Sequence, residues 1–404
     1  MIANPTATAA APPPAEIGEG VWVGRAFLPG VGPAVICVMG GVVSDITAHV
    51  ATTSALFDRP DPVGFLRGLP ACPAMADLES LLVHADPDLR GEGQAYLLAP
   101  IDLQAIKAAG VTFAASMVER VVEEQAKGDP SAADGIRAGL MAEIGADLSK
   151  IVPGSEDATR LKALLSARGL WSQYLEVGLG PDAEIFTKAQ PLSAVGSGAE
   201  IGIHPKSHWN NPEPEIVLVV SSAGQIVGAT LGNDVNLRDF EGRSALLLSK
   251  AKDNNASTSI GPLVRLFDET FSLDDVRKAD VGLRVSGHDG FVLYGVSSIS
   301  QISRDPADLV AQTINRMHQY PDGFVLFLGT MFAPTKDRDA VGSGFTHKPG
   351  DIVSIHSHRL GTLINRVTYS DKAPEWRVGL RGLMANLAGR GLLGAAVNAS
   401  DEAA

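Results

Sequence analysis

Short apolar runs separated by glycine, proline and polar residues dominate the sequence, and this pattern predicts a β-rich fold. In the clearest example, an apolar run at residues 216–220 is followed by turn residues at 221–225 and a second apolar run at 226–231. Runs of this length bounded by turn residues indicate the two strands of a hairpin. A second hairpin is expected around residues 287–290. Further strands are expected at residues 21–27, 33–38, 42–46, 281–286, 291–296, 324–328, 350–355 and 361–367.

Residues 114–168 have a different pattern, in which apolar residues recur three and four positions apart. This spacing is typical of one face of a helix, and Ser131 and Ser155 are suitable N-cap residues. We expect these helices to cover the β core. Shorter helices are expected at residues 61–67, 76–82, 238–252 and 305 to about 317, with Leu246, Leu247 and Leu248 buried on the third.

The chain has 404 residues, of which 45% are hydrophobic, and can form two domains or one large domain around a sizeable core. We expect a disordered tail at residues 1–19, which are rich in Ala, Pro and Thr. This stretch contains no basic residue, so it does not resemble a signal peptide. A small β-rich domain is expected at 20–97, a catalytic domain at 98–388 and a loose tail at 389–404.

The formal net charge of −13 argues against a nucleic-acid partner and against binding to an anionic membrane. No apolar run reaches the length of a membrane span. Cys37 and Cys72 are too few for a disulfide framework, which fits a reducing cytoplasm. We therefore expect a cytoplasmic protein that binds a small molecule. An acidic substrate would need a metal ion, an Arg or a Lys close to it.

Three carboxylates are the strongest candidates for chemistry. Glu213 and Glu215 are two positions apart at the start of the first hairpin strand, so their side chains should point to the same face. Asp234 follows the returning strand, and the hairpin could bring it to the first two. Oxygen ligands without a nearby Cys or His favour a hard cation, Mg²⁺ or alternatively Mn²⁺ or Ca²⁺. The alternative is a solvated acidic strand edge, but the apolar flanks and the residues after Asp234 favour a site.

Basic groups follow these acids in the sequence. Arg238 and Lys252 could balance the carboxylate charge, and Lys252 could transfer a proton if the site lowers its pKa. Otherwise Lys252 is a solvated lysine at a helix end. Gly329 and Thr330 end an apolar run and could present a backbone N–H and a hydroxyl to an anion. They could equally form an ordinary turn.

The order of these features resembles the fumarylacetoacetate hydrolase superfamily over residues 185–367. The shared order is Glu-x-Glu, hairpin, Asp-Val-x-x-Arg-Asp, helix, Lys, buried strand and Gly-Thr. The resemblance implies an α+β fold, a mixed β-sandwich roll with a small β-rich N-terminal domain and a helical cover. It also implies a homo-oligomer. By this resemblance the metal ligands are Glu213, Glu215 and Asp234, and Lys252 lies near the metal. Thr330 holds a substrate oxygen, while Gly329, Arg238 and Lys188 lie beside the substrate.

One departure from the family changes the expected reaction. C–C hydrolases of the superfamily carry a Tyr-x-x-His-x-x-Glu motif, whose His and Glu activate water. The matching segment is 113–119, where Ser116 replaces the His and Glu119 is retained. A neutral Ser cannot serve as that base, so hydrolysis is in doubt. Ser116, Glu119 and Lys252 remain the candidate catalytic residues.

Residues 112–120 and 232–257 are closer to one branch of the superfamily, the 2-keto-3-deoxy-pentonate dehydratases of pentose catabolism. This resemblance implies a Mg²⁺-dependent dehydratase that converts a 2-oxo sugar acid, 2-keto-3-deoxy-D-xylonate, to 2,5-dioxopentanoate. The first alternative is a hydrolase of fumarylacetoacetate or acylpyruvates on the same site. The second is a metal-binding relative without catalytic activity.

Overall fold

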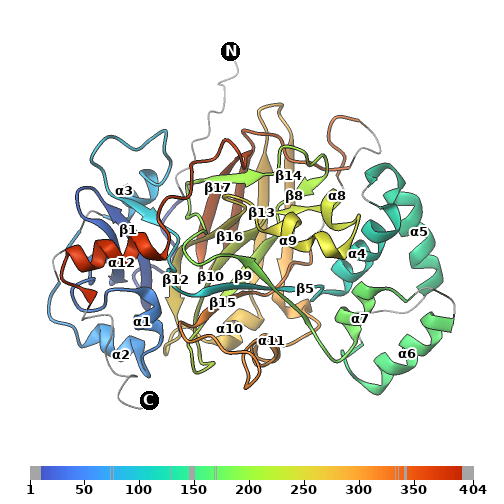
Figure 1. Cartoon of the computed structure of the whole chain (residues 1–404), viewed down its shortest axis with the longest axis horizontal. Coiled ribbons are helices and arrows are strands. Elements are labelled where there is room, and N and C mark those ends of the chain that lie inside the picture. Colours follow the sequence, from blue (N-terminus) through green and yellow to red (C-terminus); the bar gives the residue numbers. More distant parts are fainter. Residues whose placement is uncertain are drawn as a thin grey trace.

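Two large β-sheets pack against each other in the centre of the computed structural model, and helices lie at both ends of the long axis (Figure 1). The structure describes residues 11–393 except 73, 76, 128, 145–150, 168, 170, 333, 335 and 341–343. The expected tail segments at residues 1–10 and 394–404 lie outside the described residues. No helix in the described part of the chain combines the length and the apolar character needed to cross a lipid bilayer.

The first sheet contains strands from both the N-terminal and the central parts of the chain. Its order is β3 (Val42–Asp45), β2 (Gly32–Met39), β1 (Val21–Leu28), β12 (Thr258–Leu266), β10 (Ile226–Asp234), β9 (Pro214–Val220), β15 (Phe324–Phe327), β5 (Ala105–Gly110) and β6 (Glu184–Ala189). A further strand, β4 (Tyr96–Leu98), pairs with β1. The second sheet has the order β14 (Val292–Ser298), β13 (Asp280–Ser286), β16 (Ile352–Ser357), β17 (Gly361–Tyr369) and β7 (Glu200–Ile203). A small ribbon pairs β8 (Asn210–Asn211) with β11 (Asn236–Leu237).

The helices form two groups and several connections. One group covers the end of the molecule that carries the candidate site: α4 (Ala114–Ala126), α5 (Ala133–Ile144), α6 (Glu156–Ala167) and α7 (Gln173–Leu179). The other end carries α1 (Thr53–Phe57), α2 (Pro62–Arg67), α3 (Leu78–Val83) and α12 (Leu380–Gly389). The connections contain α8 (Arg238–Glu241), α9 (Leu248–Lys252), α10 (Leu273–Arg277) and α11 (Pro306–Thr313). The expected helices at 114–168 are thus present, whereas α7 and α12 were not foreseen.

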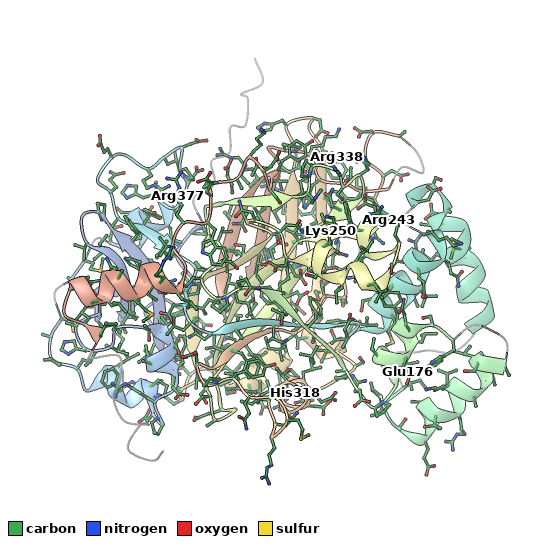
Figure 2. All side chains as sticks on the ribbon, in the orientation of Figure 1. Glu176, Arg243, Lys250, His318, Arg338 and Arg377 are labelled. Carbon is green, nitrogen blue, oxygen red and sulfur yellow. The ribbon has the colours of Figure 1, made fainter. Side chains whose placement is uncertain are left out.

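The expected continuous helix at 238–252 is wrong. The segment divides into α8, a 3₁₀ turn (Ala245–Leu247) and α9. Ser244 accepts a hydrogen bond from the backbone of Leu246 and so caps a new turn after Gly242. Leu246 is 95% exposed, contrary to the expected burial. Arg243 and Lys250 of the same segment, labelled in Figure 2, are exposed as well. Likewise α11 ends at Thr313 rather than near 317, because Asn315 and His318 form a tight turn.

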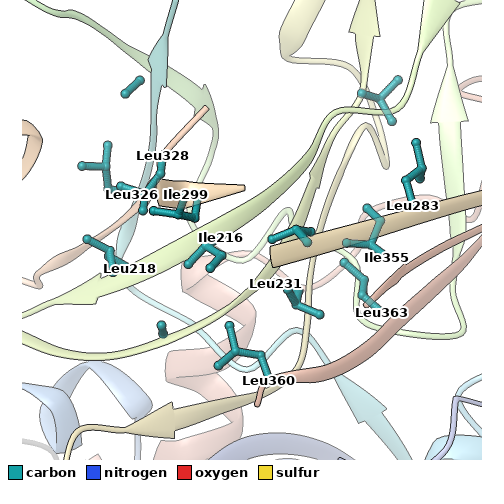
Figure 3. Packing of buried hydrophobic residues seen from close by; sticks show 14 of the residues in the cluster. Ile216, Leu218, Leu231, Leu283, Ile299, Leu326, Leu328, Ile355, Leu360 and Leu363 are labelled. Carbon is teal, nitrogen blue, oxygen red and sulfur yellow. The ribbon is translucent and has the colours of Figure 1, made fainter. Parts of the chain in front are cut away.

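Apart from Glu215, strand β9 carries apolar residues throughout, because both of its faces are buried. Ile216 and Leu218 pack toward the second sheet, whereas Val217 and Val219 pack toward the N-terminal strands and α1. Each such side chain contributes about 1.5–3 kcal/mol on burial. The cluster in Figure 3 also includes Leu231, Leu283, Ile355 and Leu363. This packing holds the β9–β10 hairpin in a fixed position within the first sheet, with one face against the second sheet.

The N-terminal strands β1, β2 and β3 form part of the first sheet. In the register of β1 with β12, Trp22 pairs with Arg265 and Val23 with Val264. Helix α12 packs on β2, where Asn386 Nδ2 donates to Val31 O over 2.7 Å. The strands of the proposed domains 20–97 and 98–388 therefore share one sheet, and the boundary between the domains stays a prediction.

Candidate metal centre

The β9–β10 hairpin brings Glu213, Glu215 and Asp234 together. Glu215 pairs with Gly232 across the hairpin, and the backbone N–H of Asp234 donates to Glu213 O over 3.0 Å. One carboxylate oxygen from each residue lies within 4.8 Å of the other two. The three residues are only 5%, 3% and 2% exposed. The expected convergence of the three carboxylates is thus confirmed, and their role as metal ligands stays a prediction.

Two lysines lie against these carboxylates. Lys252 Nζ donates to Glu213 Oε2 over 2.6 Å and to Asp234 Oδ2 over 3.0 Å. Lys188 Nζ lies 3.1 Å from Asp234 Oδ1 and donates to the carbonyl oxygens of Lys252 and Ser257. Lys188 is fully buried, and its contacts hold Asp234 and the backbone after α9 in place.

The carboxylates differ in their affinity for a proton. Burial alone would raise the pKa of Glu213, but Lys252 and Arg120 lower it to about 2. Burial, Asp234 and Glu213 raise the pKa of Glu215 well above its usual value. Burial opposes the charge of Lys252, but Asp234 and Glu213 outweigh it and raise the pKa of this lysine. The site therefore does not lower the pKa of Lys252, and Lys252 carries a positive charge here.

The end of β15 completes one wall. The backbone N–H of Gly329 donates to Glu215 Oε2 over 2.7 Å. Gly329 has φ +87°, and a Cβ atom there would lie 2.1 Å from Thr112 Oγ1, so a glycine is required. Thr330 follows on the cavity wall, and its hydroxyl accepts a hydrogen bond from Phe332 N over 3.1 Å.

These groups surround a cavity of about 20 Å³. A space of this size holds about one water molecule or one small ion. Asp234 Oδ1 is buried against the Lys188 ammonium, 3.1 Å away. Three buried carboxylates that each place an oxygen within 4.8 Å of the other two fit a hard divalent cation such as Mg²⁺, with Mn²⁺ or Ca²⁺ as alternatives.

Sequence patterns alone did not assign three charged residues that line the cavity. Arg120 Nη2 donates to Glu213 Oε1 over 2.6 Å, and its Nη1 donates to Glu241 Oε2 over 2.9 Å. Glu184 extends from β6 over Gly110, where a Cβ atom would lie 2.0 Å from Glu184 Oε2. Burial first, and then the charge of Glu241, raise the pKa of Glu184 to about 7.

A signal for two of these residues was present in the sequence. Glu184 lies four positions before Lys188, so both side chains point to the same face of one strand. Arg120 lies one helical turn after Ser116, in a helix that was expected. Glu241 had no such signal, because the helix assigned to its segment was wrong.

Four residues expected at the site do not line this cavity, and one of them is Lys188, whose substrate role stays a prediction. Ser116 caps α4, since its hydroxyl accepts from Phe113 N and donates to Phe113 O. Glu119 is held by Arg137 at 2.5 Å and by Arg238 at 3.4 Å. Arg238 also lies 4.3 Å over the ring of Trp209. The catalytic roles of Ser116 and Glu119 and the substrate role of Arg238 stay predictions.

Residues 169–368 match the family model described as fumarylacetoacetate (FAA) hydrolase C-terminal. This part of the chain is similar to the fumarylacetoacetate hydrolase family. The expected α+β fold of that family is confirmed by solved structures. The apo form of 2-keto-3-deoxy-D-arabinonate dehydratase has a TM-score of 0.60 and 21% identity, over 86% of this chain and 98% of that one. The same values hold for its complex with magnesium and 2,5-dioxopentanoate. A fumarylacetoacetate hydrolase from Exiguobacterium antarcticum has a TM-score of 0.52 and 16% identity, over 87% of this chain and 100% of that one.

Two curated relatives are similar in sequence. The 2-dehydro-3-deoxy-D-arabinonate dehydratase of Saccharolobus solfataricus is 33% identical over 184 residues, 46% of this chain and 58% of that protein. The "Probable 2-keto-3-deoxyxylonate dehydratase" of Haloferax volcanii is 33% identical over 196 residues, 48% of this chain and 63% of that protein. The matched region thus spans less than two thirds of either relative.

Proposed function

We propose that the protein is a divalent-cation-dependent dehydratase of 2-keto-3-deoxy-D-xylonate, also called 2-dehydro-3-deoxy-D-arabinonate. Its product would be 2,5-dioxopentanoate. The observation that carries this proposal is the buried trio Glu213, Glu215 and Asp234 around a cavity of the size of one ion. The names of the two curated relatives and of the magnesium complex support the substrate class and the cation. From the pentose-derived acids in those names we infer a role in pentose catabolism, and we propose a cytoplasmic homo-oligomer.

A divalent cation held by these carboxylates would supply Lewis-acid stabilisation for the charge that develops on the 2-oxo group. Mg²⁺ is the first candidate. The residues would then have separate tasks. Thr330, beside Gly329, would donate its hydroxyl to a substrate oxygen. Lys188 would hold Asp234 in place, since it contacts this carboxylate and the neighbouring backbone. Lys252 would hold Glu213 and Asp234 together, since it contacts both acids.

Dehydration removes one proton from C3 and a hydroxide from C4, which leave together as water and leave a C3=C4 double bond. Loss of a proton from C5 and addition of one at C3 would move this double bond to C4=C5, and the enol so formed would tautomerise to the aldehyde of the dioxo acid. Glu184 is our candidate for proton transfer to the leaving hydroxyl. Its pKa of about 7 leaves a substantial protonated fraction at neutral pH, and its carboxyl group lines the cavity. Lys252, whose Nζ contacts Glu213 and Asp234, would either move a proton or stabilise negative charge.

The arrangement around Ser116 favours dehydration over C–C hydrolysis. A hydrolase needs a base to activate water, and the residue in the position of the family histidine is a helix-capping serine. Glu119, the other residue of that motif, is neutralised by Arg137 and Arg238 and lies outside the cavity wall. Glu119 could take part only after a rearrangement of these ion pairs.

The direct test is incubation of the purified protein and Mg²⁺ with 2-keto-3-deoxy-D-xylonate, followed by NMR. We expect the aldehyde signal of 2,5-dioxopentanoate to appear, and EDTA to abolish it. Acetylpyruvate in a parallel reaction distinguishes the alternative, because a hydrolase would release pyruvate and acetate from it. If the protein consumes neither substrate, and Lys252→Ala behaves as wild type does in both assays, the protein has no catalytic activity of either kind.

A further inference from the structure

The cavity at the candidate metal centre is too small for the substrate of the proposed function. It measures about 20 Å³, whereas sites for small organic ligands usually enclose about 300 Å³ or more. A cation would fit beside Glu213, Glu215 and Asp234, but a 2-oxo acid would not. A side chain on the cavity wall that moves aside would make room for the substrate.

Arg120 is the wall residue best placed to move. It projects from α4, in the helical cover, whereas the three carboxylates lie on the buried β9–β10 hairpin. Its guanidinium spans the cavity between Glu213 at 2.6 Å and Glu241 at 2.9 Å. Lys252, the other cation on Glu213, is 2% exposed and is also held by Asp234. Arg120 is less enclosed, with 13% of its side chain exposed.

The two ends of the Arg120 contact respond differently to a cation. Both oxygens of Glu213 accept a charged hydrogen bond, Oε1 from Arg120 and Oε2 from Lys252. A divalent ion that binds Glu213 cancels its charge and so weakens its attraction for Arg120. Glu241 does not belong to the carboxylate trio and would keep its attraction for the guanidinium.

We propose that Arg120 is both a gate and the binding residue for the substrate carboxylate. In the structure it bridges Glu213 and Glu241 and lines the cavity. Cation binding releases it from Glu213, and it turns about its contact with Glu241 to open that space. The guanidinium then meets the carboxylate of the 2-oxo acid, for which its planar fork is well suited. This inference rests on the proposed function for its ligand class, a 2-oxo acid.

The first experiment titrates Mg²⁺ alone into wild type and Arg120→Gln by calorimetry. We expect Mg²⁺ to bind about tenfold more tightly to Arg120→Gln, because one charge-assisted hydrogen bond to Glu213 no longer competes. Arg137→Gln is the matched control, since Arg137 also projects from the helical cover to a carboxylate, Glu119, that does not line the cavity. We expect its Mg²⁺ affinity to equal that of wild type.

The second experiment titrates pyruvate, the smallest 2-oxo acid, into each Mg²⁺-loaded protein. We expect affinity for pyruvate to fall about a hundredfold in Arg120→Gln and to recover in part in Arg120→Lys. In turnover of the sugar acid, the same variants should raise KM more than they lower kcat. A purely structural role would change the thermal stability without this pattern.

Three outcomes overturn the inference. Equal Mg²⁺ affinity in wild type and Arg120→Gln would show that Arg120 does not compete with the cation. A crystal structure with Mg²⁺ and pyruvate in which Arg120 remains 2.6 Å from Glu213 would exclude the gate. If wild type binds no Mg²⁺, the gate and the proposed function fail together. If Mg²⁺ and pyruvate behave as expected but the sugar acid is not dehydrated, the gate stands and only the proposed function fails.

Discussion

Glu184 and Glu213 illustrate how one cavity gives two carboxylates opposite properties. Arg120 and Lys252 hold Glu213 in its charged form, with a pKa of about 2, against the effect of burial. Around Glu184, burial and the charge of Glu241 outweigh the same two cations, and its pKa rises to about 7. A pair of carboxyl groups with separated pKa values is a common arrangement for acid–base catalysis. We therefore assign ion binding to the first and proton transfer to the second.

This assignment predicts that Glu184→Gln lowers kcat for the sugar acid by about 10²- to 10⁴-fold, because Gln cannot give up a proton. Calorimetry should find Mg²⁺ binding retained. Exchange of the C3 protons in D₂O, followed by NMR, should also persist, since Glu184 is assigned to the leaving hydroxyl. Glu176→Gln is the control, because Glu176 lies on α7 away from the cavity (Figure 2). Full activity in Glu184→Gln would remove Glu184 from the mechanism.

At the scale of single elements, the end of β15 depends on a glycine. Gly329→Ala should destabilise the protein by about 1–3 kcal/mol from backbone strain alone, since an alanine at φ +87° is unfavourable. The added Cβ would also press on Thr112 and displace the N–H that donates to Glu215. We expect weaker Mg²⁺ binding as a second effect, measured by calorimetry beside urea unfolding.

Gly290→Ala separates the two effects. Gly290 has φ +79°, but a Cβ atom there would meet no atom within 4 Å. Gly290→Ala should therefore lower the free energy of unfolding through backbone strain and leave Mg²⁺ affinity unchanged. Equal Mg²⁺ affinity in the two variants would mean that the Gly329 N–H does not position Glu215.

The β9–β10 hairpin could be predicted from sequence because its information is local. An apolar run, a turn and a returning run fix which residues share a face, and hence the approach of Glu213, Glu215 and Asp234. The break between α8 and α9 could not be predicted in this way. The run of leucines at 246–248 suggested a buried helical face, but Ser244 starts a new turn that leaves Leu246 in solvent. Local capping there prevailed over the apolar pattern.

At the scale of the whole molecule, the cavity is assembled from segments far apart in sequence. Arg120 comes from the helical cover, Glu184 from β6 at the edge of the first sheet, and Gly329 from the segment just after β15. Periodicity predicts the face of an element on which each residue lies, but not which elements meet. Only the packing of the cover against the sheets places Arg120 on Glu213, which explains why its contact was not foreseen.

The connection after β15 is fixed to the second sheet by a buried charged network. Arg338 donates to both oxygens of Asp351, over 2.6 Å and 2.8 Å, and also to Asp289. His347 Nδ1 lies 3.2 Å from Asp351 Oδ2, and Asn210 accepts from the backbone N–H of His347. Burial first, together with the nearby charge of Arg338, lowers the pKa of His347 despite the attraction of Asp351.

This network predicts that stability falls as the solution becomes acidic. His347 is buried in its neutral form, so its folded pKa lies below the value of about 6.5 in the unfolded chain. Between these values the unfolded state binds more protons, and the free energy of unfolding decreases with falling pH. Burial raises the pKa of Asp351, but Arg338 and His347 outweigh burial and lower it overall. The contribution of Asp351 to the free energy of unfolding is therefore lost only below about pH 3.9.

His347→Asn removes the titrating group and keeps a side-chain N–H that can reach Asp351. Between pH 7 and pH 5, urea unfolding in EDTA should give a shallower loss of stability than in wild type. The difference can reach about 1.4 kcal/mol per pH unit for one fully linked proton. His318→Asn, at an exposed position, should follow the wild-type curve. Parallel curves for wild type and His347→Asn would mean that His347 does not link folding to pH.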